Sequence, residues 1–151
     1  MSKDVRLEDV TAQKWRAVAK LKLADDQKQL LASNVWSIAQ SKFDPDANPR
    51  AICAGDQVVG FLMYDLPDIG DEVQEASIYR FMIDMAHQGK GYGREALTQA
   101  IAEIRDIPGI RKISISYVRN NARAKQFYAS FGFVERDSGK DDYELSAELV
   151  L

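Results

Sequence analysis

One stretch of the sequence combines flexible turns with positive charge, a combination that binds phosphate groups. Its residues are His87, Gln88, Gly89, Lys90, Gly91, Tyr92, Gly93 and Arg94. Glycine adopts positive φ angles and leaves its backbone N–H groups uncovered. If a helix begins here, the free N–H groups of its first turn and its macrodipole favour an anion. Because Lys90 and Arg94 would add full positive charges, we predict a pyrophosphate site.

The residues on either side predict a strand before this loop and a helix after it. Residues 75–84 mix aromatic, β-branched and long apolar side chains, as buried strands do. After the loop, apolar residues recur at helical spacing, namely Ala96, Leu97, Ala100, Ile101 and Ile104. Pro108 and Gly109 then end the helix near Ile107. A plain strand-to-helix turn that binds nothing has the same composition, so the loop alone leaves both readings open.

A second stretch reads Asn121-x-x-Ala124-x-x-Phe127-Tyr128, followed by Gly132-Phe133. It predicts a helix over about 121–131, with Asn121 as N-cap and Gly132 ending the helix. The apolar spacing is that of a core-facing helix, which explains most of these residues without a ligand. Tyr128 is different, because a buried tyrosine hydroxyl needs a hydrogen-bond partner.

The other predicted elements follow from turn residues and apolar periodicity. They are a strand over 5–10, helices over 11–23 and 26–40, a loop over 43–49, a hairpin of 51–54 with 57–64, and strands over 111–118, 133–136 and 143–149. Neither repeats nor linkers interrupt this order, so we expect one domain over residues 1–151.

The glycine spacing excludes two common nucleotide motifs. The sequence contains no G-x-x-x-x-G-K-[ST], and Arg94 stands where the third glycine of a Rossmann fingerprint would be. Instead, Gln88-x-x-Gly91-x-Gly93 and the Asn121 motif together resemble the two halves of the acetyl-CoA site in the GNAT superfamily of N-acetyltransferases. The expected order of elements is similar over the whole chain. The resemblance implies an α/β GNAT fold, with a mixed, mostly antiparallel central sheet flanked by about four helices.

Within this superfamily, the sequence RFMID followed by QGKGYG resembles bacterial diamine and polyamine (spermidine/spermine) N-acetyltransferases. The implied reaction is acetyl transfer from acetyl-CoA to a small amine by direct attack on the thioester, without a metal. Amino-acid, aminoglycoside and protein-amine acetyltransferases are the alternatives within enzymes. A non-catalytic acyl-CoA-binding module is the alternative outside them.

The resemblance assigns residues to acetyl-CoA by position. They are Met82, Ile83, Gln88, Gly89, Lys90, Gly91, Tyr92, Gly93, Arg94, Asn121, Lys125 and Tyr128. The loop would hold the pyrophosphate, while Asn121 and the backbone of Met82 and Ile83 would hold the pantetheine arm. Lys125 would approach the adenosine phosphates, and Tyr128 would assist the leaving thiolate.

The general base departs from the family pattern. Some members place a glutamate on the inward face of the long strand, where this sequence is expected to carry Ser77, Tyr79 and Phe81. We therefore expect the amine proton to leave to bulk water, or to Glu75 through a water molecule.

The resemblance implies an acceptor site between the first two helices, where Asp25 and Asp26 lie. Trp36, Tyr64 and Tyr79 are either walls of this site or core residues. Acidic residues without any Lys or Arg among them crowd the connection into the long strand, namely Asp65, Asp68, Asp71, Glu72 and Glu75. This cluster could attract a polycation, or it could be a solvated loop.

Composition limits the classes of protein that fit. The chain has 151 residues, 46% of them hydrophobic and 28% charged, as in ordinary globular domains. Its net charge of −3 disfavours nucleic acid as the main partner, and no apolar run is long enough to span a membrane. The single cysteine, Cys53, excludes an internal disulfide and favours the cytoplasm. One Cys and one His are too few for a zinc site. A homodimer and a monomer both remain open.

Overall fold

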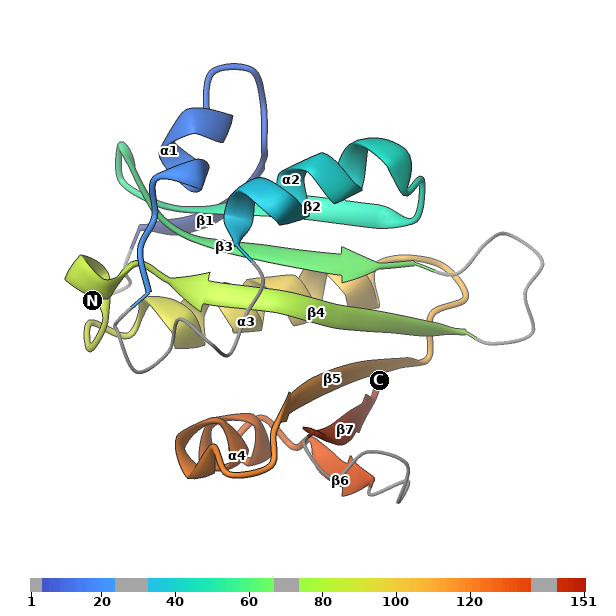
Figure 1. Ribbon diagram of the computed structural model, residues 1–151. Coiled ribbons are helices and arrows are strands. Elements are labelled where there is room, and N and C mark those ends of the chain that lie inside the picture. Colours follow the sequence, from blue (N-terminus) through green and yellow to red (C-terminus); the bar gives the residue numbers. More distant parts are fainter. Residues whose placement is uncertain (1–3, 24–32, 67–73, 137–143) are drawn as a thin grey trace.

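The computed structural model describes residues 4–23, 33–66, 74–136 and 144–151 (Figure 1). Its centre is a seven-stranded sheet in the order β1-β2-β3-β4-β5-β7-β6. The strands are β1 (Val5–Asp9), β2 (Ala47–Ala54), β3 (Gln57–Asp65), β4 (Glu75–Ile83), β5 (Lys112–Val118), β6 (Val134–Arg136) and β7 (Glu144–Val150). Every neighbouring pair is antiparallel except β4 with β5. The predicted mixed, mostly antiparallel sheet is confirmed.

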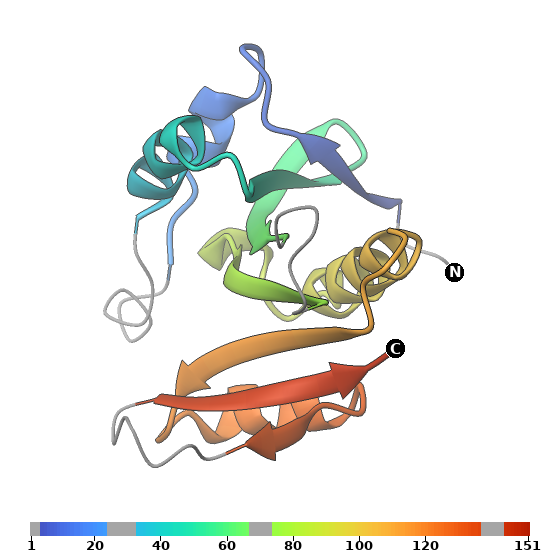
Figure 2. The ribbon, with the colours of Figure 1, turned by 90° about the vertical axis from the view of Figure 1, so that its right-hand side faces the viewer.

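Helices cover both faces of the sheet. They are α1 (Trp15–Ala19), α2 (Asn34–Phe43), the short 3-10 helix η1 (Met85–His87), α3 (Tyr92–Arg105) and α4 (Ala122–Ala129). Figure 2 shows α1 and α2 on one side of the N-terminal strands and α3 on the other. The α1/α2 face has a core that includes Val18, Phe61 and Met82. The core on the α3 face is larger, and the apolar side chains of α4 pack against it.

The sheet opens between β4 and β5. The two strands pair only from Glu75–Lys112 to Ile78–Ile115, and beyond that point β4 continues to Ile83 without β5 beside it. In Figure 1 the two strands diverge toward the C-terminal end of β4. Such a gap within a sheet leaves backbone N–H and C=O groups available for another partner.

A β-bulge at Tyr79 changes which residues of β4 share a face. Its neighbours Ile78 and Arg80 pair with Tyr64 and Met63, so Tyr79 is the extra residue in β4. As a result, Phe81 packs against the core on the α3 face, whereas Tyr79 packs against the core on the α1/α2 face. The expectation that Ser77, Tyr79 and Phe81 point the same way is wrong, because strict alternation does not continue through a bulge.

The first two helices differ from their predicted bounds. Residues 11–23 were predicted as one helix, but α1 has only five residues, Trp15–Ala19. The helix stops early because the backbone of Lys22 bonds to the end of β4 instead: its N–H donates to the Asp84 carboxylate at 2.7 Å, and its carbonyl accepts from the Met85 N–H at 2.6 Å. For the second helix, Ser33 is the N-cap: its hydroxyl accepts a hydrogen bond from the Trp36 N–H at 3.1 Å. The predicted start at Asp26 lies outside the described residues.

The predicted loop over 43–49 is also partly wrong. Strand β2 begins at Ala47 and contains Pro49. Proline is tolerated there because β1 pairs with β2 only as far as Arg50, so that β2 is an edge strand at Pro49.

Candidate active site

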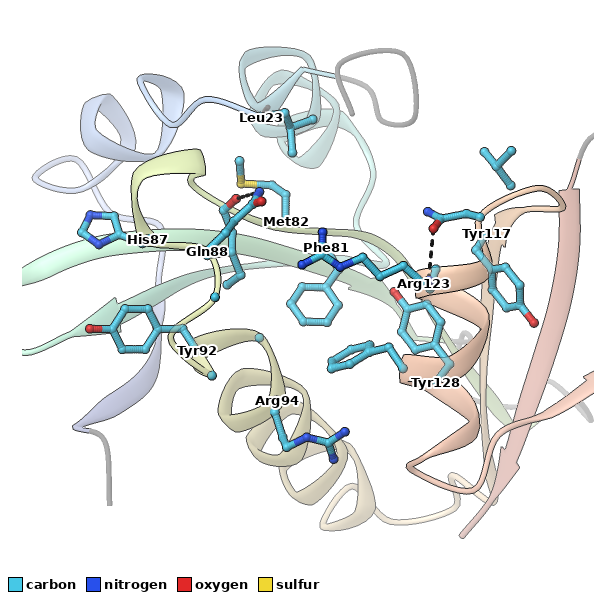
Figure 3. A pocket seen from close by; sticks show the side chains of 18 of the residues that line it. Leu23, Phe81, Met82, His87, Gln88, Tyr92, Arg94, Tyr117, Arg123 and Tyr128 are labelled. Atoms are coloured by element: carbon cyan, nitrogen blue, oxygen red, sulfur yellow. Dashed lines mark hydrogen bonds between the residues drawn. The ribbon is translucent and has the colours of Figure 1, made fainter. Parts of the chain in front are cut away.

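A cavity of about 450 Å³ lies where β4 and β5 separate, between the start of α3 and the start of α4 (Figure 3). Its lining residues are Leu23, Phe81, Met82, Ile83, His87, Gln88, Gly89, Gly91, Tyr92, Gly93, Arg94, Ser116, Tyr117, Val118, Asn121, Arg123, Ala124, Phe127 and Tyr128. The size suits a small-molecule site, and the lining combines an apolar interior with a few polar groups. Both sequence motifs meet at this one cavity.

The glycine loop has the backbone that its sequence predicts. Gly89 and Gly91 have φ angles of +78° and +83°, which only glycine adopts readily. Gly91 is the N-cap of α3 and, as a glycine, has no side chain to cap the helix, and Gly91, Tyr92 and Gly93 at this helix start line the cavity. A Cβ on Gly93 would lie 3.6 Å from Ile83 and 3.9 Å from the Phe81 ring, at ordinary contact distance. The loop therefore has the geometry of an anion site.

Neither of the two charges expected beside this loop is directed at it. Lys90 is exposed and does not line the cavity. The Arg94 guanidinium donates to the Ser130 hydroxyl at 2.7 Å and lies 4.7 Å from the centre of the Phe131 ring. In Figure 3 the Arg94 side chain extends away from the glycine loop. Arg94 thus contributes its stem to the cavity wall, while its charge contacts α4.

The β4 edge at the cavity presents alternate backbone groups. Phe61 and Met82 are paired, and the Asp84 N–H donates to the Val59 carbonyl at 2.8 Å. Because hydrogen-bonding direction alternates along a strand, Met82 bonds toward β3, and the backbone groups of Phe81 and Ile83 face the gap. The expectation that Met82 offers its backbone there is corrected by this alternation.

Gln88 lies beside the same edge. Its side-chain amide donates to the Ile83 carbonyl at 3.0 Å. This bond joins the glycine loop to the end of β4 and fixes one side of the cavity opening.

The start of α4 forms the opposite wall. The Asn121 side-chain oxygen accepts a hydrogen bond from the Ala124 N–H at 3.1 Å, so Asn121 is the N-cap of α4. It also lines the cavity, which leaves its amide nitrogen to face a ligand. The structural role and the binding role proposed for Asn121 are therefore compatible.

Tyr128 reaches the cavity from the next turns of α4. Its ring stacks on Tyr117 with 5.6 Å between centroids and meets Phe127 and Phe133 edge-on. Burial raises the pKa of the Tyr128 hydroxyl to about 12. The structure shows no hydrogen bond from this hydroxyl to any residue that it describes, whereas the Tyr117 hydroxyl donates to Glu135 at 2.8 Å. Tyr128 is thus a protonated donor facing the cavity.

Lys125 faces away from the cavity, and Arg123 lines it instead. The Lys125 ammonium lies 3.4 Å from the Glu135 carboxylate, on the side of α4 next to β6. Arg123 was not singled out from the sequence, although it precedes Phe127 by four residues and so shares its helix face. Phe81, His87 and other lining residues were also missed, because apolar residues and a lone histidine carry no distinctive spacing.

Glu75 lies outside the site. It begins β4, six residues before Phe81, which is about 20 Å along a strand. Its carboxylate faces Lys112 at 3.8 Å, near the end of β4 opposite to the cavity. This placement removes Glu75 from the candidate catalytic residues.

The residues expected to wall an acceptor pocket are not brought together. Trp36 lies on α2 with 64% of its surface exposed. Tyr79 is on the same side of the sheet, and burial raises the pKa of its hydroxyl above the ordinary value. Tyr64 is on the α3 side, where it lines a separate cavity of about 320 Å³ and donates to Glu103 at 2.6 Å.

Several acidic residues expected at the acceptor site lie outside the described residues. They are Asp25, Asp26, Asp68, Asp71 and Glu72. Within the described ranges, no group of three or more His, Cys, Asp or Glu side chains could hold a metal ion. Nor does any helix in these ranges have the length and apolar character needed to cross a membrane.

Comparisons with known proteins agree with this geometry. Residues 15–133 match the Acetyltransferase (GNAT) family. The spermine/spermidine N(1)-acetyltransferase of Bacillus subtilis (strain 168) is 26% identical over 132 residues, which are 85% of this chain and 87% of that protein.

Solved structures share the fold. The spermidine N-acetyltransferase of Vibrio cholerae, in complex with CoA and spermine, has a TM-score of 0.77 at 17% identity, over 97% of this chain and 95% of that one. The ribosomal-protein-S18-alanine N-acetyltransferase of Escherichia coli has a TM-score of 0.73 at 16% identity, over 97% and 93%. The family match spans most of the sequence, and the fold agrees with it: the chain belongs to the GNAT family of N-acetyltransferases.

Proposed function

We propose that this protein transfers an acetyl group from acetyl-CoA to a primary amine of a diamine or polyamine. The observation that carries the proposal is one cavity in which a helix N-terminus with a glycine N-cap, an open strand edge and the hydroxyl of Tyr128 converge. These groups fit the three parts of acetyl-CoA that matter for transfer, namely an anion, an amide-containing arm and a thioester.

The N–H groups of the first turn of α3 suit the pyrophosphate. The Phe81 and Ile83 backbone groups that face the gap suit the amides of the pantetheine arm, as an added strand would. Asn121 faces the arm from the other wall with its amide nitrogen. Acetyl-CoA supplies the acetyl group as an activated thioester.

The residues of the chain then act on the attacked carbonyl and on the leaving sulfur. A backbone N–H of Phe81 or Ile83 can donate to the developing oxyanion, a contribution of about 3 kcal/mol for one donor. Tyr128 donates to the negative charge that develops on sulfur. Holding the amine against the thioester supplies much of the remaining rate.

Deprotonation of the amine falls to water. None of the described lining residues is an Asp or Glu, and a primary amine resembling Lys has a pKa of about 10. The amine therefore loses its proton to solvent as it enters the cavity.

The choice of acceptor rests on the relatives and on charge. The Bacillus subtilis and Vibrio cholerae proteins act on spermine or spermidine by name. The segment between Asp65 and Glu75 is acidic, with no Lys or Arg. A protein amine is the second candidate, since the Escherichia coli structure of similar fold acts on an alanine of ribosomal protein S18.

The test is a panel of amines with acetyl-CoA, in which the release of free thiol is followed. Spermidine and spermine should give the highest kcat/KM, above lysine, an aminoglycoside and a peptide with N-terminal alanine. Reversing Asp68, Asp71 and Glu72 to Lys should raise KM for spermidine far more than for a monoamine, less so at high salt. The highest kcat/KM with the peptide would assign the protein-amine function, and no thiol release with any amine would favour a non-catalytic module.

A further inference from the structure

The start of α4 carries a cation that no motif assigns to a ligand. Arg123 is in the first turn of this helix, it is exposed, and it lines the cavity. In Figure 3 its side chain extends from α4 across the cavity toward the side of Phe81 and Gln88. Arg123 lies four residues before Phe127 and therefore on the same face of α4, the face that lines the cavity.

The other basic side chains near the cavity are engaged or directed elsewhere. The Arg94 guanidinium bonds to Ser130, and Lys125 is paired with Glu135. Lys90 is exposed outside the lining. For Arg123, by contrast, the structure records no ion pair or hydrogen bond with the residues it describes, and the described lining contains no carboxylate.

We propose that Arg123 binds a phosphate group of the coenzyme, an inference that rests on the proposed use of acetyl-CoA. The facing wall is the start of α3, whose helix dipole favours the same kind of anion. A pyrophosphate between the two walls receives backbone N–H groups from α3 and a guanidinium fork from α4. Arg123 would repel a cationic amine, so the acceptor is not the ligand of this side chain.

The assignment changes the interpretation of the second motif. Asn121 positions α4 by capping it, and Arg123, two residues later, supplies the charge that Lys125 was expected to supply. The coenzyme is then held from both sides of the gap in the sheet, with one motif contributing dipoles and the other contributing a full charge.

The experiment compares Arg123→Gln with Lys125→Gln, and with Arg105→Gln as a control for net charge. Arg105 is exposed at the far end of α3 and does not line the cavity. Calorimetric titration with acetyl-CoA, without any amine, should show affinity weakened about 10- to 100-fold in Arg123→Gln alone. Its affinity should also depend less on salt than that of the wild type.

A second donor separates the phosphate role from other roles. S-acetylpantetheine carries the thioester without phosphate, so kcat/KM with this donor should be equal in Arg123→Gln and in the wild type. Equal loss with both donors would place Arg123 at the thioester, and loss only in Lys125→Gln would return the role to Lys125; either overturns the proposal. A wild type that does not bind acetyl-CoA overturns the proposed function itself.

Discussion

Replacing Tyr128 with phenylalanine tests whether this hydroxyl assists departure of the thiolate. The change keeps the ring, and with it the contacts to Tyr117, Phe127 and Phe133. It removes only a hydroxyl that has no hydrogen bond to any residue described by the structure. The free energy of unfolding at pH 7 should therefore change by less than about 0.5 kcal/mol, and affinity for acetyl-CoA should be retained.

The pKa of Tyr128 determines what kind of help it can give. Burial raises this pKa to about 12, whereas a thiol has a reference pKa of about 8.5. Complete proton transfer to a thiolate is then uphill by about 5 kcal/mol. Tyr128 therefore acts as a hydrogen-bond donor rather than as an acid that loses its proton. The loss of one such donor should lower kcat by about 10²- to 10³-fold.

The assay is thiol release under conditions where chemistry limits the rate, with Tyr117→Phe as the matched control. Tyr117 lines the same cavity and stacks on Tyr128, but its hydroxyl donates to Glu135 at 2.8 Å. The control should keep kcat within a few-fold of the wild type. A near-normal kcat in Tyr128→Phe, or an equal loss in both variants, would refute the assignment and make Tyr128 a packing residue.

The same pKa predicts a stability effect at high pH. Because the pKa of Tyr128 is raised above its unfolded value of about 10, the folded state holds this proton more tightly. The contribution is fully present below pH 10 and is lost as the pH rises from about 10 to 12. Urea unfolding at pH 9 and pH 11 should show a smaller loss in Tyr128→Phe than in the wild type. An equal loss would contradict the burial of the hydroxyl.

Three further predictions concern the loop, the second cavity and the cysteine. Gly93→Ala should leave the free energy of unfolding unchanged or raise it by up to about 1 kcal/mol, since the φ of Gly93 is not positive. The added methyl group in the glycine loop should nevertheless weaken acetyl-CoA binding. Unchanged affinity in calorimetry would remove the loop from the site. Glu103→Ala should lower the free energy of unfolding by about 1–3 kcal/mol in urea, because Arg50 and Tyr64 lose a charged partner at 2.8 and 2.6 Å. A decrease below about 0.5 kcal/mol, which is typical of surface substitutions, would contradict this. Burial raises the pKa of the Cys53 thiol to about 11, so a thiol reagent at pH 8 should label it slowly until urea is added; immediate labelling would show that the thiol is accessible.

Apolar periodicity and turn residues predicted those parts of the site whose conformation depends on residues close in sequence. The strand, glycine loop and helix over Glu75–Arg105 follow from apolar periodicity and from two glycines that need positive φ. The α4 motif follows from helical spacing, and its meeting with the loop follows from the family resemblance.

Features that depend on distant partners were not predictable in this way. The bulge at Tyr79 arises from the register with β3, and it reversed the expected face of Tyr79 relative to Phe81. Arg94 bonds to Ser130, 36 residues away. By contrast, two errors were avoidable, because strand rise alone separates Glu75 from the cavity and helix phase alone places Arg123 on the face of Phe127.

The short β4–β5 ladder has a mechanical consequence. Four residue pairs join these strands, and the Arg111 N–H donates to the Gln74 carbonyl at 2.9 Å beside the first pair. Toward the cavity, β4 continues to Ile83 without β5 beside it, so the segment that carries β5, α4, β6 and β7 is joined to β4 at one end of the strand. A ligand that bonds to both walls therefore acts as a cross-link between two segments of the fold. At a concentration 100 times its Kd, it would stabilise the folded state by about 2.7 kcal/mol. Hydrogen exchange should report this as slower exchange in β5 and β7, far along the chain from the glycine loop.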